Sequence, residues 1–383
     1  MKRRGNNEGS IFKRPNGRWE AHATVKQANG LPKRVCVSAK SYALVKEKLN
    51  AILKANKHGL VHSGKDWTMG AYLDYWLKEV QHGNIAETTM SLYERMIRLY
   101  IKPTLGHHRL QDLSVHDVRY AINELKQDFD RRGSHKCTLQ KCYQILSTCL
   151  NCAKNEKLIL HSPIEAIDKP KYTPKETVIW TAEQAAHFLQ TSKGHPKYIA
   201  FLLLLTYGIR RGEALGLRWC DIDFNNGLIH IRQQISWING RLMARNLKTK
   251  NSRRALPLTT KVRAALLEHA KKNDVVIPPF NPNLILSTVG MVMTNNAGKA
   301  IMPKCLEVSF HSLTRNAGLP RIKIHAMRHT AATIFKDCNV PVKDVQMILG
   351  HANISTTLNI YQHGTPENYG VAISAVEGQL LPG

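Results

Sequence analysis

The first sixty residues show the two-residue alternation of hydrophobic and polar positions that is typical of short β-strands. Three strands are predicted, over residues 9–14, 18–25 and 31–37. Ser41 then precedes apolar positions at helical spacing that end near Leu53, which predicts one helix. We therefore expect residues 1–61 to form a small three-stranded sheet with a helix, followed by a polar, glycine-containing linker.

Residues 66–170 carry apolar side chains at helical spacing almost throughout. Four helices are predicted, one starting after Thr68, one starting at Glu87 and ended by Pro103 and Gly106, one capped by Ser114, and one over residues 134–155. Helices of this length form a compact bundle. The proline-containing stretch 170–174 predicts a second linker.

The pattern over residues 174–374 changes repeatedly between helical and strand periodicity. Thr181 and Gln184 form a capping box, and the apolar run 198–207 predicts a buried helix that Gly208 ends. Strands are predicted at 228–238, 241–247 and 254–258, and further helices at 302–317, 325–337, 342–349 and 354–361. The fold class is therefore multidomain α+β, and the third part is mainly α with a β-hairpin sheet.

The charge of the chain indicates a polyanionic partner. Lys and Arg number 55 against 28 acidic residues, which gives a formal net charge of +27. Neutralising phosphates releases condensed counterions, so such a chain favours nucleic acid, although a generally basic surface would explain the same count. Residues 1–61 alone carry 14 Lys and Arg against 3 Glu. A sheet of this kind can lie in a DNA major groove, or its charges can form a solvated face around a core that contains Trp19.

No segment predicts export or membrane insertion. No apolar run follows the basic N-terminus, and the longest apolar run, 198–207, is about half of what spans a bilayer. Cys142, Cys149 and Cys152 fall in a helical pattern without a second ligand pair, which favours reduced core cysteines over a zinc site. We expect a cytoplasmic protein without a metal or other cofactor.

Four short motifs in the last 180 residues contain the residue types that a phosphoryl-transfer site needs. Their chemistry-bearing positions are Arg210 in Arg-Arg-Gly-Glu, Lys248 and Lys250 in Lys-Thr-Lys, His325 and Arg328 in His-Ala-Met-Arg-His, and His351 in Leu-Gly-His, with Tyr361 ten residues later. Cations and hydrogen-bond donors of this kind suit a phosphodiester whose charge must be stabilised while a phenol attacks it. Plainer roles also fit: Arg210 as a helix-end charge paired with Glu213, and His351 as a helix cap.

The segments TYGIRRGEALGLRWCDID, LKTKNSRRALPL, IHAMRHTAATIF and ILGHANISTTLNIYQH resemble the signature motifs of the tyrosine recombinases, or phage-type integrases. The three-part layout is similar to that of integrases of temperate phages and of conjugative transposons from Gram-positive bacteria. The resemblance implies six catalytic residues, namely Arg210, Lys248, His325, Arg328, His351 and the nucleophile Tyr361. Lys250 stays open as the alternative to Lys248, and His329 is expected to be structural.

The same resemblance implies a reaction and its partners. The enzyme would cut and rejoin DNA through a 3′-phosphotyrosine intermediate, integrating and excising a phage or mobile element without a cofactor. Residues 1–61 would bind arm-type DNA sites, residues 66–170 would bind the core site, and residues 174–374 would form the catalytic domain. A homotetramer on double-stranded attachment sites is implied, together with an excision factor and a host DNA-bending protein in the bacterial cytoplasm.

Three rival functions share parts of this pattern. A type IB topoisomerase-like nicking and closing enzyme would use the same chemistry but would not need an arm-binding domain. A DNA-binding regulator on an inactive scaffold would not need all six catalytic positions filled. A metal-dependent nuclease would use paired aspartates, and Asp221 and Asp223 lie instead where turn and capping roles are usual.

Overall fold

The computed structural model describes most of the chain. The described residues are 9–26, 32–57, 67–133, 136–173, 177–238, 240–247, 250–283, 286–355 and 357–358. The chain separates into two compact units, with the boundary between Pro174 and Lys175.

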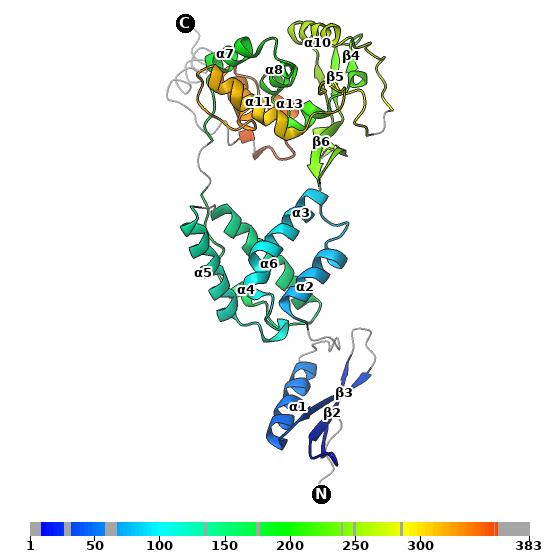
Figure 1. Ribbon diagram of the computed structural model, residues 1–383, viewed down its shortest axis with the longest axis vertical. Helices are drawn as coiled ribbons and strands as arrows, with labels where there is room; N and C mark the ends of the chain where they lie inside the picture. Colours follow the sequence, from blue (N-terminus) through cyan, green and yellow to red (C-terminus); the bar gives the residue numbers. More distant parts are fainter. Residues whose placement is uncertain are drawn as a thin grey trace, which may run out of the picture. The chain divides into compact units, whose positions relative to one another are not determined.

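A small antiparallel sheet begins the first unit, as predicted. Its strands are β1 (Ser10–Lys13), β2 (Trp19–Lys26) and β3 (Pro32–Ala39), in the order β1-β2-β3. The helix α1 (Tyr42–Lys57) lies against the sheet (Figure 1), and the Ser41 hydroxyl accepts a hydrogen bond from the Leu44 amide. Ala21, Ala23, Val45 and Leu49 form the buried core between them. Because side chains alternate along a strand, Glu20 and His22, which flank Ala21, point to the opposite, open face of the sheet.

Four helical stretches form the rest of the first unit around a separate core that contains Trp76, Ile101 and Leu146. They are α2 (Met69–Tyr75), extended by a π-turn at Trp76–Val80; α3 (Glu87–Met96), extended by a π-turn at Ile97–Ile101 into α4 (Lys102–Leu105); α5 (Val115–Arg131); and α6 (Lys136–Asn155). Ser114 and Asp117 form a capping box at the start of α5.

The second helix was predicted to end at Pro103 and Gly106; the structure confirms Gly106, and the part that names Pro103 is wrong. Pro103 lies in the first turn of α4, where the missing amide hydrogen has no carbonyl partner to lose, and the preceding π-turn carries the chain into it. The chain leaves the helix only at Gly106, whose amide donates to the Lys102 carbonyl at 2.9 Å.

The second unit packs helices around α8 (Tyr198–Tyr207), most of whose side chains are buried. The other helices are α7 (Ala182–Ser192), α9 (Arg211–Gly216), α10 (Thr260–Lys272), α11 (Pro303–Asn316), α12 (Ala326–Asp337) and α13 (Val342–Leu349). One sheet has the order β4 (Ile222–Asp223), β5 (Leu228–Ile231), β8 (Arg254–Pro257), and the other pairs β6 (Gln233–Ile238) with β7 (Arg241–Asn246). Figure 1 shows α7, α8 and α11 grouped together and α10 beside β4 and β5.

Two features of this unit differ from the prediction. The strand expected over 228–238 is broken at Arg232, so β5 and β6 belong to different sheets. The helix α10 was not predicted, although Thr259 precedes it and Val262, Leu266 and Ala270 bury one of its faces. The predicted helix 354–361 lies only partly within the described residues.

The eight cysteines, all within the described ranges, are free. Cys142 and Cys149 are buried in the helical bundle, and burial raises the pKa of the Cys142 thiol to about 12. They are therefore protonated core residues, as expected.

Of the helices in the described ranges, none combines the length and the apolar character that crossing a bilayer requires.

Candidate active site

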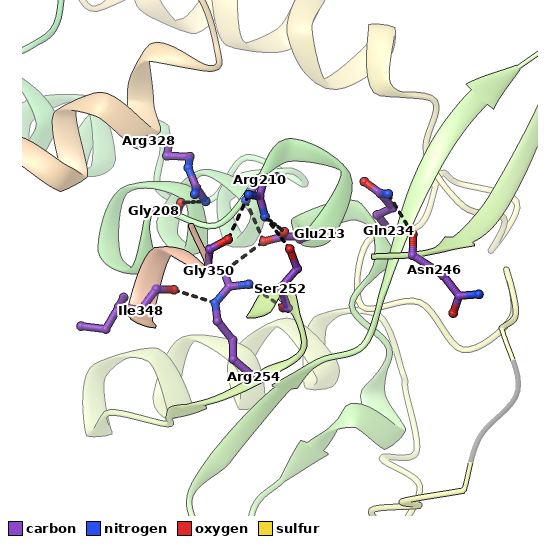
Figure 2. Close-up of polar contacts among 10 residues, drawn as sticks. All are labelled: Gly208, Arg210, Glu213, Gln234, Asn246, Ser252, Arg254, Arg328, Ile348 and Gly350. Carbon is purple, nitrogen blue, oxygen red and sulfur yellow. Dashed lines mark hydrogen bonds and ion pairs between the residues drawn. The ribbon is translucent and has the colours of Figure 1, made fainter. Parts of the chain in front are cut away.

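Arg210 stands at the junction between two helices. Gly208 ends α8 in the left-handed conformation, with φ of 60°, and a Cβ there would come within 2.4 Å of Leu349 Cδ2. A residue with a side chain would therefore be strained at this turn, after which Arg210 is the N-cap of α9. The Arg210 guanidinium donates to Glu213 Oε1 at 2.7 Å, to Ser252 Oγ at 3.2 Å and to the Gly350 carbonyl at 3.1 Å (Figure 2).

Glu213 holds two arginines at once. Its side chain is 1% exposed, and its second oxygen, Oε2, accepts from the Arg210 amide at 3.0 Å and from Arg254 Nη2 at 3.0 Å. Burial alone would raise the pKa of this carboxyl, but Arg254 and Arg210 outweigh it and the net shift is downward. Glu213 is therefore an ionised anchor that fixes Arg210 in place.

Arg254 was not identified from the sequence. Besides Glu213, it donates to the Ile348 carbonyl at 2.6 Å and to the Ser252 carbonyl at 2.9 Å (Figure 2). It thus connects α9, the turn before β8 and the end of α13. The sequence did contain one signal, since Arg254 occupies an inward position of β8, two residues before the buried Leu256.

Arg328 is buried, and one of its guanidinium N–H groups has no acceptor among the described residues. The residue is 4% exposed, and its Nη1 donates to the Gly208 carbonyl at 2.7 Å. Among the described residues its Nη2 is buried without a hydrogen-bond partner. Burial and then the charge of Arg210 lower the pKa of Arg328 to about 9, so the guanidinium is still charged at neutral pH. A buried cationic donor without an acceptor is costly unless an anion completes it.

His325 precedes the first turn of α12, and His329 follows it one turn later. His325 is the N-cap of the helix, and the two imidazole rings are 5.4 Å apart in a T-shaped contact. Desolvation, followed by the charges of His329, Arg328 and Arg210, lowers the pKa of His325 to about 4. At neutral pH the imidazole is neutral and can accept or donate a proton.

His351 follows the turn that ends α13. Gly350 adopts φ of 70°, and a Cβ there would meet Arg254 Nη1 at 2.9 Å and the Asn251 carbonyl at 3.1 Å. His351 Nδ1 and the buried Thr357 hydroxyl lie 2.8 Å apart and share a hydrogen bond. Burial, followed by the nearby Arg328 and Arg210, lowers the pKa of His351 to about 4. Thr357, like Ser252, is a supporting residue that the motif did not reveal.

The structure thus brings together Arg210, Arg328, His325 and His351 from three separated sequence motifs. Lys248 and Tyr361 lie outside the described residues, as does the side chain of Lys250. The short helical turn Lys250–Ser252 begins at the second of the two candidate lysines, and its Asn251 and Ser252 contact this cluster.

Electrostatically, the cluster carries an excess of positive charge. Arg210, Arg254 and Arg328 share one close carboxylate among the described residues, that of Glu213. Arg211, the neighbour of Arg210, faces elsewhere and pairs with Glu307 at 3.7 Å. With neutral histidines the cluster can bind an anion with charge-assisted hydrogen bonds.

The two aspartates considered for a metal site have other partners. Asp221 forms an ion pair with Arg218 at 2.8 Å, and both side chains are 1% exposed. Asp223 Oδ1 accepts from the Asn225 and Asn226 amides at 3.1 and 2.9 Å, which closes the turn before β5. Asp221 Oδ2 also accepts from the Arg218 amide at 3.3 Å, as a capping residue, so the structure confirms the turn and capping roles predicted for the two aspartates.

Comparison with known families covers both units of the chain. The model described as "Phage integrase family" matches residues 180–368, and "Phage integrase, N-terminal SAM-like domain" matches residues 68–126. The chain is 29% identical over 353 residues to "Tyrosine recombinase XerC-like" of Caldanaerobacter subterraneus subsp. tengcongensis, covering 88% of each. It is 25% identical over 363 residues to "Transposase from transposon Tn916" of Enterococcus faecalis, covering 91% of this chain and 84% of that one.

Solved structures show the same fold. The Tn1549 transposon integrase in complex with a circular intermediate DNA matches with a TM-score of 0.67 and 23% identity, covering 80% of this chain and 99% of that one. A lambda integrase tetramer bound to a Holliday junction matches with a TM-score of 0.60 and 15% identity, covering 94% and 96%.

Proposed function

The chain belongs to the phage integrase family of tyrosine recombinases, and from that premise we propose how its own residues carry out strand exchange. It is a tyrosine-type site-specific DNA recombinase of the kind found in integrases and conjugative transposons. The roles of single residues, of the domains and of the assembly are our proposals.

Arg210 and Arg328 bind the scissile phosphate. The observation that supports this assignment is the buried Nη2 of Arg328, which has no acceptor among the described residues. A non-bridging phosphate oxygen satisfies that donor, and a second one meets the guanidinium that Glu213 orients. The same two cations then stabilise the additional negative charge of the pentacoordinate transition state.

Tyr361 is the nucleophile. A phenol has an unperturbed pKa of about 10, so it attacks at neutral pH only if its proton is removed as the bond forms. His325 and His351 have lowered pKa values and are neutral, so either can accept this proton or hold a phosphate oxygen. Lys248 donates a proton to the leaving 5′ oxygen, and Lys250 is the alternative for that role.

The bonds balance without an external energy source. The tyrosine oxygen forms an ester with the 3′ phosphate while the bond to the 5′ oxygen breaks, leaving a free 5′ hydroxyl. A 5′ hydroxyl from another strand then attacks this ester in the reverse reaction and releases the tyrosine. Because one phosphoester replaces another in each step, strand exchange needs no ATP. Arg210 and Arg328 supply the positive charge that a metal ion would otherwise supply, so no metal cofactor is needed.

The domains divide the DNA between them. We assign residues 1–61 to arm-type sites, because of their charge and open sheet face, and residues 66–170 with 174–374 to the core site. Four protomers would join two duplexes, as in the lambda integrase tetramer on a Holliday junction. The resulting reaction integrates and excises a mobile element in the bacterial cytoplasm, with an excision factor and a host DNA-bending protein as partners.

The substitution Tyr361→Phe tests this mechanism. It removes only the hydroxyl, so binding to a core-site duplex should stay near wild type while covalent attachment disappears. A nicked suicide substrate labelled on the strand that ends at the scissile phosphate, followed by a denaturing gel, measures the adduct. Wild-type protein should retain that label through a 3′ linkage. A covalent adduct formed by the Tyr361→Phe variant would contradict the nucleophile assignment.

A further inference from the structure

The open face of the N-terminal sheet carries a compact group of metal-ligand side chains. Glu20 and His22 are two residues apart on β2 and therefore point to the same face. In the antiparallel register Cys36 of β3 lies directly opposite His22. Helix α1 packs on the other face, against Ala21 and Ala23.

The three ligand atoms converge on one point. His22 Nε2 lies 2.8 Å from Glu20 Oε1, and Cys36 Sγ donates to the same oxygen at 2.9 Å. One ligand atom from each residue lies within 4.8 Å of the other two. A zinc ion holds nitrogen and oxygen at about 2.0–2.2 Å and sulfur at about 2.3 Å, so a small outward movement of the three side chains makes room for it.

We propose that Glu20, His22 and Cys36 bind one zinc ion on this face, with water as the fourth ligand. Thiolate, imidazole and carboxylate together suit zinc better than the harder magnesium or calcium ions, which prefer oxygen ligands alone. The two charges of a carboxylate and a thiolate neutralise the divalent ion. Three protein ligands plus water give the open tetrahedral geometry that zinc also adopts in enzymes.

Two arginines contact the proposed ligands, and zinc binding must displace some of these contacts. Arg14 pairs with both oxygens of Glu20: its Nη2 donates to Oε1 at 2.8 Å, and its Nε pairs with Oε2. Zinc at Oε1 would therefore displace the Nη2 contact, while the Nε contact to Oε2 can remain. The guanidinium of Arg34 faces His22 Nδ1. Because an arginine can only donate, Nδ1 is the acceptor and the His22 proton lies on Nε2, facing Glu20.

Zinc binding therefore has a defined proton balance. The Cys36 thiol loses its proton to solvent as the thiolate binds. The His22 proton moves from Nε2 to Nδ1, so that Nε2 can coordinate the ion. Arg34 must then leave His22, because two N–H groups would face each other. One proton is released for each zinc ion bound.

The test uses the untagged full-length protein under reducing conditions. Zinc affinity is measured by competition with a chromophoric chelator, proton release with a weakly buffered indicator, and the ligand type from the absorption spectrum of the cobalt(II) form. We expect one equivalent to bind with release of one proton, and a thiolate-to-cobalt charge-transfer band. Cys36→Ser and His22→Gln should each weaken zinc binding by more than about tenfold, while Cys338→Ser, which changes another exposed cysteine, should bind as wild type.

Two further measurements separate metal binding from folding. Cys36→Ser keeps a hydroxyl that can donate to Glu20, so its circular dichroism without metal should match the wild type. In the wild-type protein, zinc should slow alkylation of Cys36 and leave that of Cys338 unchanged. Equal zinc affinity in the wild type and Cys36→Ser, a cobalt spectrum without the thiolate band, or alkylation of Cys36 unaffected by zinc would each overturn the proposal.

Discussion

Each unit of the chain contains a buried glutamate that is paired with arginine, and the two clusters differ in the ligand that they can bind. Glu20, on the small sheet, accepts from Arg14, His22 and Cys36. Glu213, in the second unit, holds Arg210 and Arg254. The residue types are similar, but the balance of charge is not.

In the N-terminal cluster the donors converge on the carboxylate. Arg14 and Cys36 both donate to Glu20, and it is mainly these neighbouring side chains that shield Glu20 from solvent. In the second cluster Glu213 pairs with two arginines, Arg210 and Arg254, and the nearby Arg328 has an Nη2 that is buried without an acceptor among the described residues. In the first cluster all the donors have an acceptor, the Glu20 carboxylate, and such a carboxylate serves a structural network or binds a cation. In the second cluster a buried donor has no acceptor, which indicates a site for an anion.

The largest difference between the clusters should appear in catalysis. Arg328→Lys keeps a charge, but its single nitrogen cannot occupy both the Nη1 position at the Gly208 carbonyl and the Nη2 position proposed for a phosphate oxygen. We expect the rate of covalent capture on a core-site oligonucleotide to fall by about 10²- to 10³-fold, with DNA binding much less affected. The matched change Arg14→Lys should leave core-site capture unchanged. Capture at the wild-type rate by Arg328→Lys would refute the anion-site assignment.

The next difference concerns stability. Glu213→Gln conserves shape but leaves the buried Arg254 and the partly exposed Arg210 without their carboxylate, which should lower the free energy of unfolding by about 3–5 kcal/mol, mainly through Arg254. Glu20→Gln should cost distinctly less, because Arg14 is half exposed and can be solvated. Urea unfolding of both variants measures this order, and the reverse order would contradict it.

The smallest effect should be a difference in the pH range over which each cluster loses its contribution to stability. His325 and His351 have folded pKa values of about 4 against an ordinary 6.5, so the unfolded state takes up these protons first as the pH falls. The second unit should therefore lose stability between pH 6.5 and 4. The Glu20 carboxyl, whose pKa its hydrogen bonds to Arg14, Cys36 and His22 lower to about 2, loses its contribution only between pH 4.5 and 2.

Peptide-resolved hydrogen exchange, corrected for the intrinsic pH dependence of exchange, measures this separation. Between pH 7 and 5, protection in α12 and α13 should fall more than protection in β2 and β3. An equal loss in both regions would mean that the histidines are not the groups that titrate.

Elements defined by local pattern could be predicted closely from the sequence. The helix α8 has the predicted bounds because its apolar run is continuous and Gly208 must end it. The break at Arg232 could not be seen, because burial continues to alternate through Ile229, Ile231, Gln233 and Ile235. Gln233 keeps that pattern although it is polar, since its amide donates to the Gly216 and Ser287 carbonyls.

The candidate site shows the same division between local and long-range information. The motifs named Arg210, His325, Arg328 and His351, because their chemistry can be recognised from residue type and order. Their supports depend on contacts between distant segments, such as the bond from Arg254 to the Ile348 carbonyl, 94 residues away. No spacing rule links such positions, so the packing of the second unit had to be known first.

The central claim is that Arg328 neutralises charge on the scissile phosphate, and a change in that charge tests it most directly. Covalent capture by the wild type and Arg328→Ala should be compared on core-site DNA with either a normal phosphate or an uncharged methylphosphonate at the scissile position. Arg254→Lys is the control, because Arg254 holds Glu213 and should lose activity equally on both substrates. The account predicts that the loss caused by Arg328→Ala shrinks markedly on the methylphosphonate. The same loss on both substrates would contradict it.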